Sequence, residues 1–426
     1  VDLFNEGVDV PTVDTLLFLR PTDSPTLFLQ QLGRGLRRAH GKVSCTVLDF
    51  VGQHRREFRF DRKLRALLGG SRKDLVTQIE RNFPFLPAGC TLQLEAVAKQ
   101  RVLESVKLAI PTLWKAKAEE LRQVVAVKGE VTLAQFLDES GYELTDVYAG
   151  DRGWSDLREA AGLPCAPAGP NEHALRRGCS RLRHVDDLER VEIWRRWLRG
   201  SVASVASLAE RERRTLRMLV AVVADAVLET HTSLAEALVM LRQHPQVCAE
   251  LMDLLDALAQ QVDHLHPATR LAPEVPLQVH ARYTRLEMLA ALGVGDAAKP
   301  PEWREGVKWV AAANTDLLAF TLDKTSGNFS PTTSYKDRAL SRDLIQWESQ
   351  SMTTAASETG RRYREHVQRG TQVLLFARLR AEDRAFWCLG PAQYVSHAGE
   401  RPMAVTWRLE IPLPGDLYAQ FAAAVA

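Results

Sequence analysis

Two arginines three positions apart carry the clearest chemical signal in the sequence. The segment from Gln30 to Arg37 reads Q-Q-L-G-R-G-L-R and has the spacing Q-x-x-G-R-x-x-R. On a helix, Arg34 and Arg37 would lie one turn apart and project from one face. Two guanidinium groups placed in this way could hold a γ-phosphate and stabilise the transition state, an effect of roughly 10³ to 10⁵ in rate. The alternative is a surface helix whose arginines only add solubility.

Two glycines in the same segment indicate a close contact. Gly33 and Gly35 each cost about 1 kcal/mol relative to alanine in a helix interior. Because a helix gains nothing from them by itself, we expect another chain segment or a ligand to approach closely at these positions.

The flanking residues predict the elements that must position this segment. Apolar runs over residues 13–19 and 43–51 are typical of strands buried on both faces. Ser24 is a good N-cap and Pro25 suits the first helical position, so the helix should run from residue 25 to 38. Strand, helix and strand in this order predict a parallel βαβ unit.

A second segment just upstream adds a family resemblance. Phe4 to Pro11, F-N-E-G-V-D-V-P, resembles motif V of superfamily-2 helicases of the DEAD/DEAH type, and Gln30 to Arg37 resembles their motif VI. The resemblance implies that this α/β segment belongs to a RecA-like domain. It also implies nucleotide-binding roles for Gly7, Asp9, Gln30 and Gly33, and catalytic arginine-finger roles for Arg34 and Arg37.

Other parts of a nucleotide site are missing from the sequence. There is no G-x-x-x-x-G-K-[ST] loop and no D-E-x-H-type carboxylate pair for magnesium. The sequence also opens on Val1 rather than Met, close to a motif. We therefore expect a fragment that does not hydrolyse ATP alone. ATP and Mg²⁺ would bind only to the complete protein, whose N-terminal helicase half would lie upstream.

The remaining sequence divides into a helical and a β-rich part, so the expected fold class is multidomain α/β plus α plus β. Apolar spacings of three and four predict helices from about residue 58 to 265. Strands are expected at residues 306–312, 317–322, 371–379, 386–389 and 403–411, with helices at 282–292 and 358–368, which suggests a small β-barrel. The expected domains are a RecA-like portion at 1–70, a helical accessory region at 71–180, a helix bundle at 181–270 and a β-rich DNA-binding domain at 271–426.

The C-terminal third carries a second resemblance. Tyr335 to Ser341, Y-K-D-R-A-L-S, and Trp347 to Ser351, W-E-S-Q-S, look like the uncharacterised domain found behind some bacterial helicases. These include modification-dependent (type IV) restriction enzymes, in which a phospholipase-D-like nuclease precedes the motor. The expected barrel is similar to SRA and PUA-like readers of modified bases. Such a reader holds a flipped base between aromatic faces and reads its edge with a carboxylate or amide.

Residues with the right chemistry for DNA occur in these segments. We expect contacts of stacking, edge-reading or phosphate-binding type from Tyr335, Lys336, Asp337, Arg338, Arg342, Trp347 and Gln350, with Phe329, Glu348 and Tyr394 as further candidates. The alternative is that Tyr335 and Trp347 are core residues and that Asp337 pairs with Arg338 or Arg342.

Composition argues against several other classes of protein. A hydrophobic content of 46%, a charged content of 25% and a net charge of +2 are those of an ordinary globular chain. The cysteines lack metal-ligand spacing, so no metal site is expected. No apolar run reaches the roughly 20 residues that span a bilayer, so we expect a reduced, cytoplasmic protein. Trp194 and Trp197, beside two arginines, are interpreted as core rather than as base-stacking groups.

The sequence therefore predicts the C-terminal portion of an ATP-dependent DNA helicase or translocase. Its terminal domain would bind DNA and recognise modified cytosine in the restriction of foreign DNA. One alternative is a repair or replication-restart helicase with a non-specific DNA-binding domain. Another is a DNA-binding module without catalysis.

Overall fold

The computed structural model of the chain contains two compact units, residues 1–117 with 141–143 and residues 118–140 with 144–426. The boundary between them falls within α5 (Trp114–Lys128). The four-domain division expected from the sequence stays a prediction. The structure describes residues 10–19, 25–50, 60–68, 72–84, 86, 89–108, 113–200, 204–262, 266–267, 271–295, 297–322 and 337–425.

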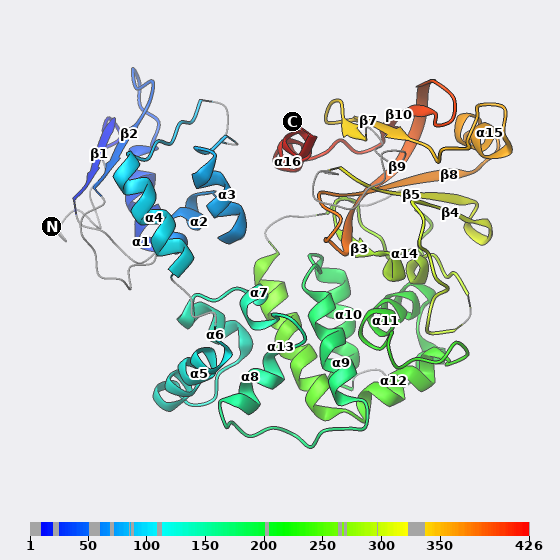
Figure 1. Cartoon of the computed structure of the whole chain (residues 1–426), viewed down its shortest axis with the longest axis horizontal. Helices are drawn as coiled ribbons and strands as arrows, with labels where there is room; N and C mark the ends of the chain where they lie inside the picture. The colour runs from blue at the N-terminus through cyan, green and yellow to red at the C-terminus, as the bar shows by residue number, and fades with distance from the viewer. Residues whose placement is uncertain are drawn as a thin grey trace. The chain divides into compact units, whose positions relative to one another are not determined.

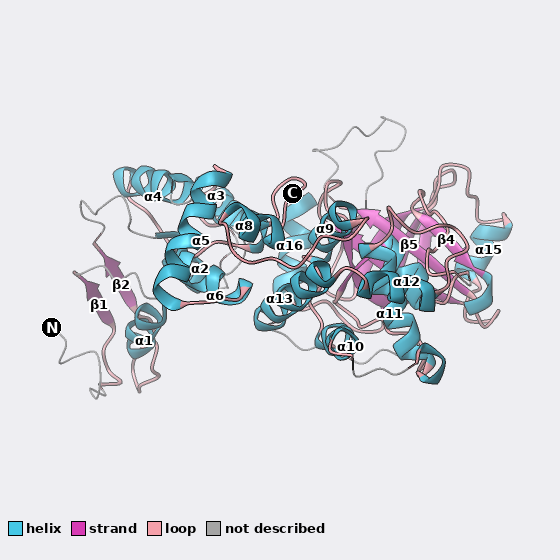
Figure 2. Cartoon of the chain, turned by 90° about the horizontal axis from the view of Figure 1, so that it is seen from below, coloured by secondary structure: helices cyan, strands magenta, loops and turns pink. Residues whose placement is uncertain are grey.

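The first unit begins with the predicted βαβ arrangement. β1 (Thr15–Phe18) and β2 (Thr46–Asp49) pair in parallel, and α1 (Pro25–Gly35) connects them. The two strands lie side by side in Figure 2. This pairing confirms the parallel βαβ unit, although α1 ends three residues before the expected residue 38.

Among the residues that the structure describes, one face of this small sheet is packed and the other is exposed. Side chains alternate along a strand, and Leu16 and Phe18 point toward α1, where Leu16 contacts Gly35 and the Phe18 ring lies 5.6 Å from that of Phe28. The opposite face presents apolar side chains that are 48 to 71% exposed in the described structure: Leu17, Leu19, Leu48 and Phe50. Parallel sheets are normally covered on both faces, so half of the usual packing is absent from the part of the chain that the structure describes.

Three further helices complete the first unit: α2 (Phe60–Leu68), α3 (Arg72–Glu80) and α4 (Ala96–Leu108). They share a small core formed by Phe60, Leu75, Ile79, Phe83, Val102 and Val106. The apolar spacing of three and four along these helices produces that core.

The second unit begins with a set of packed helices, as the sequence predicts. They are α6 (Leu133–Ser140), α7 (Leu144–Val147), α8 (Trp154–Ala160), α9 (Glu172–Cys179), η2 (Ser180–Leu182), α10 (Leu188–Leu198), η3 (Val205–Ser207), α11 (Glu210–Val223), α12 (Leu234–Arg242) and α13 (Pro245–Gln261). Trp194 and Trp197 are 0% and 2% exposed, and the indole N–H of Trp194 donates to the carbonyl of Thr215. The core interpretation of the two tryptophans is confirmed.

A mixed sheet of eight strands follows the helices. Its strands are β3 (Arg282–Thr284), β4 (Val307–Val310), β5 (Thr315–Thr321), β6 (Arg338–Ala339), β7 (Leu344–Glu348), β8 (Gln372–Arg378), β9 (Ala385–Ala398) and β10 (Ala404–Leu409). The order is β4-β5-β8-β9-β10-β7-β6, with β3 paired to β9, and β5 and β8 are parallel. Helices α14 (Arg285–Ala291), α15 (Glu358–Arg364) and α16 (Gly415–Val425) and the short η4 (Ala311–Ala313) accompany the sheet.

The expected β-barrel is not observed in the described part of the chain. β4 and β6 form the two edges of an open sheet and do not pair with each other. The five strands expected from the sequence are present, but β3, β6, β7 and α16 were not predicted. Residues 282–284, expected to begin a helix, form β3 instead. α16 covers part of the sheet, where its Phe421 ring lies 5.7 Å from that of Trp387. A helix that shields the core can replace barrel closure.

A buried network of charges joins the helices to the sheet region of the second unit. Arg190 on α10 is 1% exposed and donates to the fully buried Glu287 on α14, with 2.7 Å between Nη1 and Oε1. It also donates to Asp187, while the Nε2 atom of His184 lies 2.7 Å from the second oxygen of Glu287. The ring of Tyr283 lies 4.2 Å from the guanidinium carbon. Figure 1 shows α14 between the sheet and α11.

Within the described residues, no helix combines the length and the apolar character needed to cross a membrane.

The Glu287 carboxyl should make the stability of the second unit sensitive to acid. Burial alone would raise the pKa of Glu287, but the charges of His184 and Arg190 lower it to about 2 from the usual 4.5. The unfolded chain therefore binds a proton at this position more readily than the folded chain. We expect the free energy of unfolding, followed by tryptophan fluorescence, to fall as the pH is lowered from about 4.5 toward 2.

The variant Glu287→Gln tests whether the Glu287 carboxyl causes this loss of stability in acid. It leaves the buried Arg190 with less compensating charge, so the free energy of unfolding at neutral pH should drop by about 3 kcal/mol or more. Its further loss between about pH 4.5 and 2 should be smaller than that of the wild type. The matched change Glu302→Gln, at a side chain that is 76% exposed, should alter stability by less than about 0.5 kcal/mol. Equal effects of the two changes would contradict the network's role.

Candidate functional site

A glycine sets the distance between α1 and the strands that carry it. A Cβ atom added at Gly35 would lie 2.6 Å from the Sγ of Cys45 and 2.6 Å from a methyl carbon of Leu16. The expected close approach is therefore present at Gly35. At Gly33 nothing lies within 4 Å of such a Cβ atom, and this residue is exposed.

Lys42 ties together the ends of the two predicted motifs. Its ammonium group donates to the carbonyl oxygens of Gly35 at 2.5 Å, Arg37 at 2.9 Å and Pro11 at 3.4 Å. Pro11 is the last residue of the first motif, and the other two lie in the second. A cation at the C-terminal end of a helix also interacts favourably with the helix dipole. Lys42 thus fixes the chain that carries Arg37 against the strand that follows the first motif.

A second lysine supports the same strands from α2. Lys63 is 4% exposed and pairs with Asp49 at the end of β2, with 2.5 Å between Nζ and Oδ2. Its ammonium lies 4.7 Å from the ring centroid of Phe28 and 5.7 Å from that of Phe18. The buried charge is therefore compensated by one carboxylate and two aromatic faces. Neither lysine was predicted from the sequence. For Lys42, a basic residue close behind a helix end was an available signal.

The predicted nucleotide-site residues lie in different surroundings. Gly7 and Asp9 are outside the described residues. Gln30 is exposed on α1, and Arg34 is half-buried in its last turn. Arg37 lies two residues beyond the end of α1 and is exposed.

The expectation that both arginines project from one helical face is wrong, because the helix ends at Gly35. Gly35 packs against Leu16 and Cys45 at this point. The carbonyl oxygens of Gly35 and Arg37 then accept hydrogen bonds from Lys42, which holds the chain in a turn. An exposed guanidinium just after a helix end can still reach a phosphate brought by another part of the protein. The arrangement therefore permits an arginine-finger role but does not complete a nucleotide site.

Two candidate DNA contacts in the second unit are buried. Trp347 is 3% exposed, and its ring lies 5.6 Å from that of Tyr363 in an edge-to-face contact. A base could not stack on Trp347 while this core stays closed, so its assignment as a stacking group is corrected to a core role. Asp337 is also 3% exposed and accepts a hydrogen bond from the backbone N–H of Glu348 at 2.8 Å.

The other candidate DNA contacts lie nearer to the surface. Arg338 donates to the side chain of Gln346 at 3.1 Å, and Arg342 donates to the carbonyl of Leu413 at 2.7 Å. The exposed Gln350 donates to Glu305 at 2.6 Å. Tyr335, Lys336 and Phe329 lie outside the described residues.

Tyr394 is half-buried on β9, with its hydroxyl oxygen 2.6 Å from the Nδ1 of His397. Its ring lies edge-on to the buried Trp407. Of the candidate stacking groups that the structure describes, Trp347 and Tyr394, only Tyr394 borders the surface.

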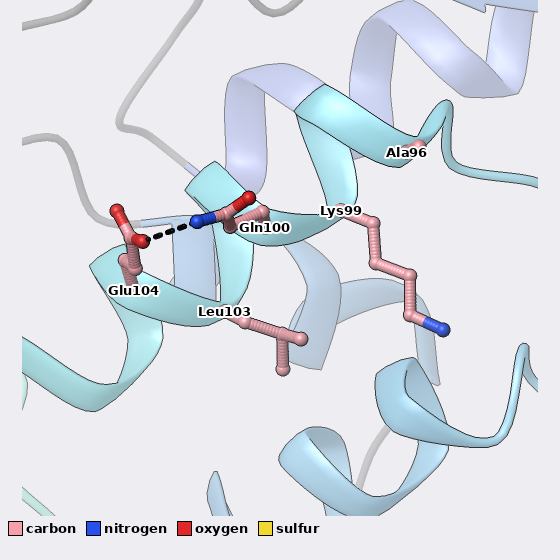
Figure 3. Close-up of a pocket in the computed structure, with 5 residues that line it drawn as sticks. All are labelled: Ala96, Lys99, Gln100, Leu103 and Glu104. Carbon is pink, nitrogen blue, oxygen red and sulfur yellow. Dashed lines mark hydrogen bonds between the residues drawn. The ribbon is translucent and has the colours of Figure 1, made fainter.

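Neither metal chemistry nor the surface hollow on α4 offers a further site. Among the residues described, no group of three or more His, Cys, Asp or Glu side chains could hold a metal ion. The hollow, of about 390 Å³, is lined by Ala96, Lys99, Gln100, Leu103 and Glu104. Figure 3 shows that these residues all come from one helix, with Gln100 bonded to Glu104. A wall on one side only cannot enclose a ligand.

Comparison with known proteins relates this chain to a domain family and to several proteins. Residues 277–421 match a domain of unknown function, DUF3427. The putative ATP-dependent helicase IRC3 of Saccharomyces cerevisiae is 48% identical over 50 residues, which are 12% of this chain and 7% of that protein. The putative mitochondrial ATP-dependent helicase irc3 of Schizosaccharomyces pombe is 48% identical over 54 residues, 13% of this chain and 9% of that protein.

A 51.5 kDa protein of a Lactococcus phage (isolate 7-9) is 41% identical over 54 residues, 13% of this chain and 12% of that protein. The matched segment thus spans between 7% and 12% of the length of these relatives. The chain is therefore similar to putative ATP-dependent helicases over a short segment and to DUF3427 over residues 277–421.

The two glycines of α1 provide a matched pair of variants. Gly35→Ala forces a methyl group into Leu16 and Cys45, so it should lower the free energy of unfolding of the first unit by about 1 to 3 kcal/mol. Gly33→Ala meets open space and should raise that free energy by up to about 1 kcal/mol through helix propensity. Urea unfolding measures both. A loss of stability in both variants would show that Gly35 has no special packing role.

Proposed function

We propose that the chain is the C-terminal portion of an ATP-driven motor that moves on DNA. The observation that carries this proposal is the anchoring of both predicted motifs by Lys42, which contacts Pro11, Gly35 and Arg37. A motor must link the segment that senses DNA to the segment that senses the nucleotide, and the half-buried Lys42 between the two motifs supplies such a link. The relation to ATP-dependent helicases supports the same function.

The uncovered sheet face supports a larger nucleotide-binding domain. Leu17, Leu19, Leu48 and Phe50 expose apolar surface that parallel sheets normally bury. In this proposal, further strands and helices of a longer polypeptide cover that face. The same polypeptide brings the phosphate-binding loop and the magnesium carboxylates. ATP and Mg²⁺ would then lie opposite Arg34 and Arg37, whose guanidinium groups would bind the γ-phosphate.

The proposed ATPase role makes Arg34 sensitive to substitution. In the longer polypeptide, Arg34→Ala should reduce DNA-stimulated ATP hydrolysis by about 10³-fold or more, because the transition-state charge loses its partner. Release of inorganic phosphate in the presence of duplex DNA measures this rate. The control is Arg38→Ala, at an exposed arginine beyond the motif, which should keep the rate within about twofold. Equal rates for the two variants would remove Arg34 from the catalytic site.

Restriction of foreign DNA through modified cytosine is the more specific form of the proposal. It depends on Tyr335 and Lys336, which lie outside the described residues, and no longer on Trp347. Binding of the chain to matched duplexes with and without 5-methylcytosine, at fixed salt, tests it. A preference of tenfold or more, about 1.4 kcal/mol, that is lost in Tyr335→Ala would support modified-base reading. Equal affinities would leave a motor whose C-terminal domain binds DNA without reading that base.

A further inference from the structure

Four arginines surround a cavity in the second unit, where the helices and the sheet meet. The cavity has a volume of about 270 Å³ and is lined by Arg181, Arg285, Arg378 and Arg384. Arg181 lies in η2, Arg285 at the start of α14, Arg378 at the end of β8, and Arg384 just before β9. We call it the arginine cavity. Its basic side chains come from segments far apart in the sequence.

Aromatic rings hold two of these guanidinium groups in place. The Cζ atoms of Arg378 and Arg285 lie 4.7 and 5.5 Å from the ring centroid of Phe386, which also lines the cavity. The Cζ atom of Arg285 also lies 5.4 Å from the ring centroid of Trp303. A guanidinium that contacts a ring with its face keeps its N–H groups at the edge available for acceptors. The rings therefore orient donors without neutralising them.

The one carboxylate that lines the cavity is already shared by two cations. Asp225 pairs with Arg181 at 3.3 Å and with Lys299 at 3.9 Å. One negative charge between two positive groups leaves an excess of positive charge. It cannot compensate the other arginines of the cavity as well.

Those other arginines lack ionic partners. Arg285, Arg378 and Arg384 form no ion pair with any residue that the structure describes. Arg285 donates from Nη1 to the carbonyl of Arg304. Its Nε atom is buried and has no hydrogen-bond acceptor among the residues that the structure describes. Arg378 donates to the hydroxyl of Thr321 and to the backbone carbonyl of Asp383. Buried donors and charges of this kind are normally satisfied.

The electrostatic state of these groups agrees with the geometry. Burial, followed by the like charge of Arg378, lowers the pKa of the Arg285 guanidinium. Burial also lowers the pKa of Arg378, although Asp383 and Glu382 oppose this shift. The paired Arg190 in the same unit is shifted upward instead by the charges of Asp187 and Glu287, which outweigh its burial. A bound anion would stabilise the charged forms of Arg285 and Arg378 in the same way.

We propose that the arginine cavity binds a phosphodiester group of a nucleic-acid backbone. Arginine forks fit phosphate oxygens through paired N–H donors. The cavity lining includes no amide side chain, and its Thr284 hydroxyl already donates to Glu287. Arginine can also bind a guanine edge in the major groove, but guanidinium groups gathered around one cavity suit the oxygens of a single phosphate better than a base edge within a duplex. The contact is therefore with the backbone and independent of base sequence. The inference rests on the proposed function and locates one DNA contact within it.

The test uses the full chain and a fluorescently labelled DNA duplex in an anisotropy titration at several salt concentrations. Arg384 is exposed and forms no hydrogen bond or ion pair with a described residue, so Arg384→Gln should leave the fold intact. We expect its Kd to rise at least fivefold and the salt slope of log Kd to fall by about 0.9, the value for one phosphate contact. Arg285→Gln should show the same two changes.

The control removes an equal charge elsewhere in the same sheet region. Arg408 on β10 is 58% exposed and only loosely paired with Asp343, at 3.9 Å, so Arg408→Gln should change Kd less than twofold. If the wild type binds DNA and Arg384→Gln and Arg408→Gln behave alike, the cavity proposal is overturned while the proposed function stands. If the wild type binds no DNA, the cavity proposal and the proposed function both fail.

Inorganic phosphate at constant ionic strength is the second probe, because a free phosphate has the same chemistry as a backbone phosphate. It should displace the duplex from the wild type more effectively than from Arg384→Gln. Phosphate that stabilises the wild type against heat, while Arg384→Gln leaves DNA affinity unchanged, would assign the cavity to a free anion and overturn the proposal.

Discussion

The buried guanidinium of Arg190 is the constraint on which the larger unit depends. A charge removed from water must be compensated within hydrogen-bond distance, and here Asp187 does so from the N-cap of α10 and Glu287 from α14. The requirement fixes where α14 lies relative to the helices. Because β3 leads directly into α14 and pairs with β9, it also fixes the position of the sheet. Part of the wall of the arginine cavity comes from α14, β3 and β9, so its shape depends in part on this ion network.

The sequence predicted the local features of the first unit because their signals are local. Pro25 and two apolar runs were enough to predict a helix between parallel strands. The end of α1 depended instead on the contact of Gly35 with Leu16 and on the hydrogen bonds of Lys42. Both contacts bring together residues from different elements. The spacing of apolar residues carries no information about such contacts. The helix was therefore predicted to continue past Arg37, although it ends at Gly35.

The second unit shows the same limit on a larger scale. Alternating apolar residues predicted five strands, but not that the sheet is open or that α16 covers it. The candidate DNA residues were selected by chemical type, and type does not separate a buried Trp347 from an exposed ring. The arginine cavity could not be predicted, because Arg181 and Arg384 approach each other only after helices and sheet have packed.

The Arg190–Glu287 pair also has a consequence for how the chain acquires its structure during synthesis. Its two members are 97 residues apart, and α10, which carries Arg190, leaves the ribosome before Glu287 is made. Until then Asp187 compensates the guanidinium without Glu287, so burial of α10 in its final packing is less favourable. Long-range contacts of this kind slow folding. The helical region is therefore expected to remain loosely packed until α14 has emerged. It should then complete its packing in one cooperative step.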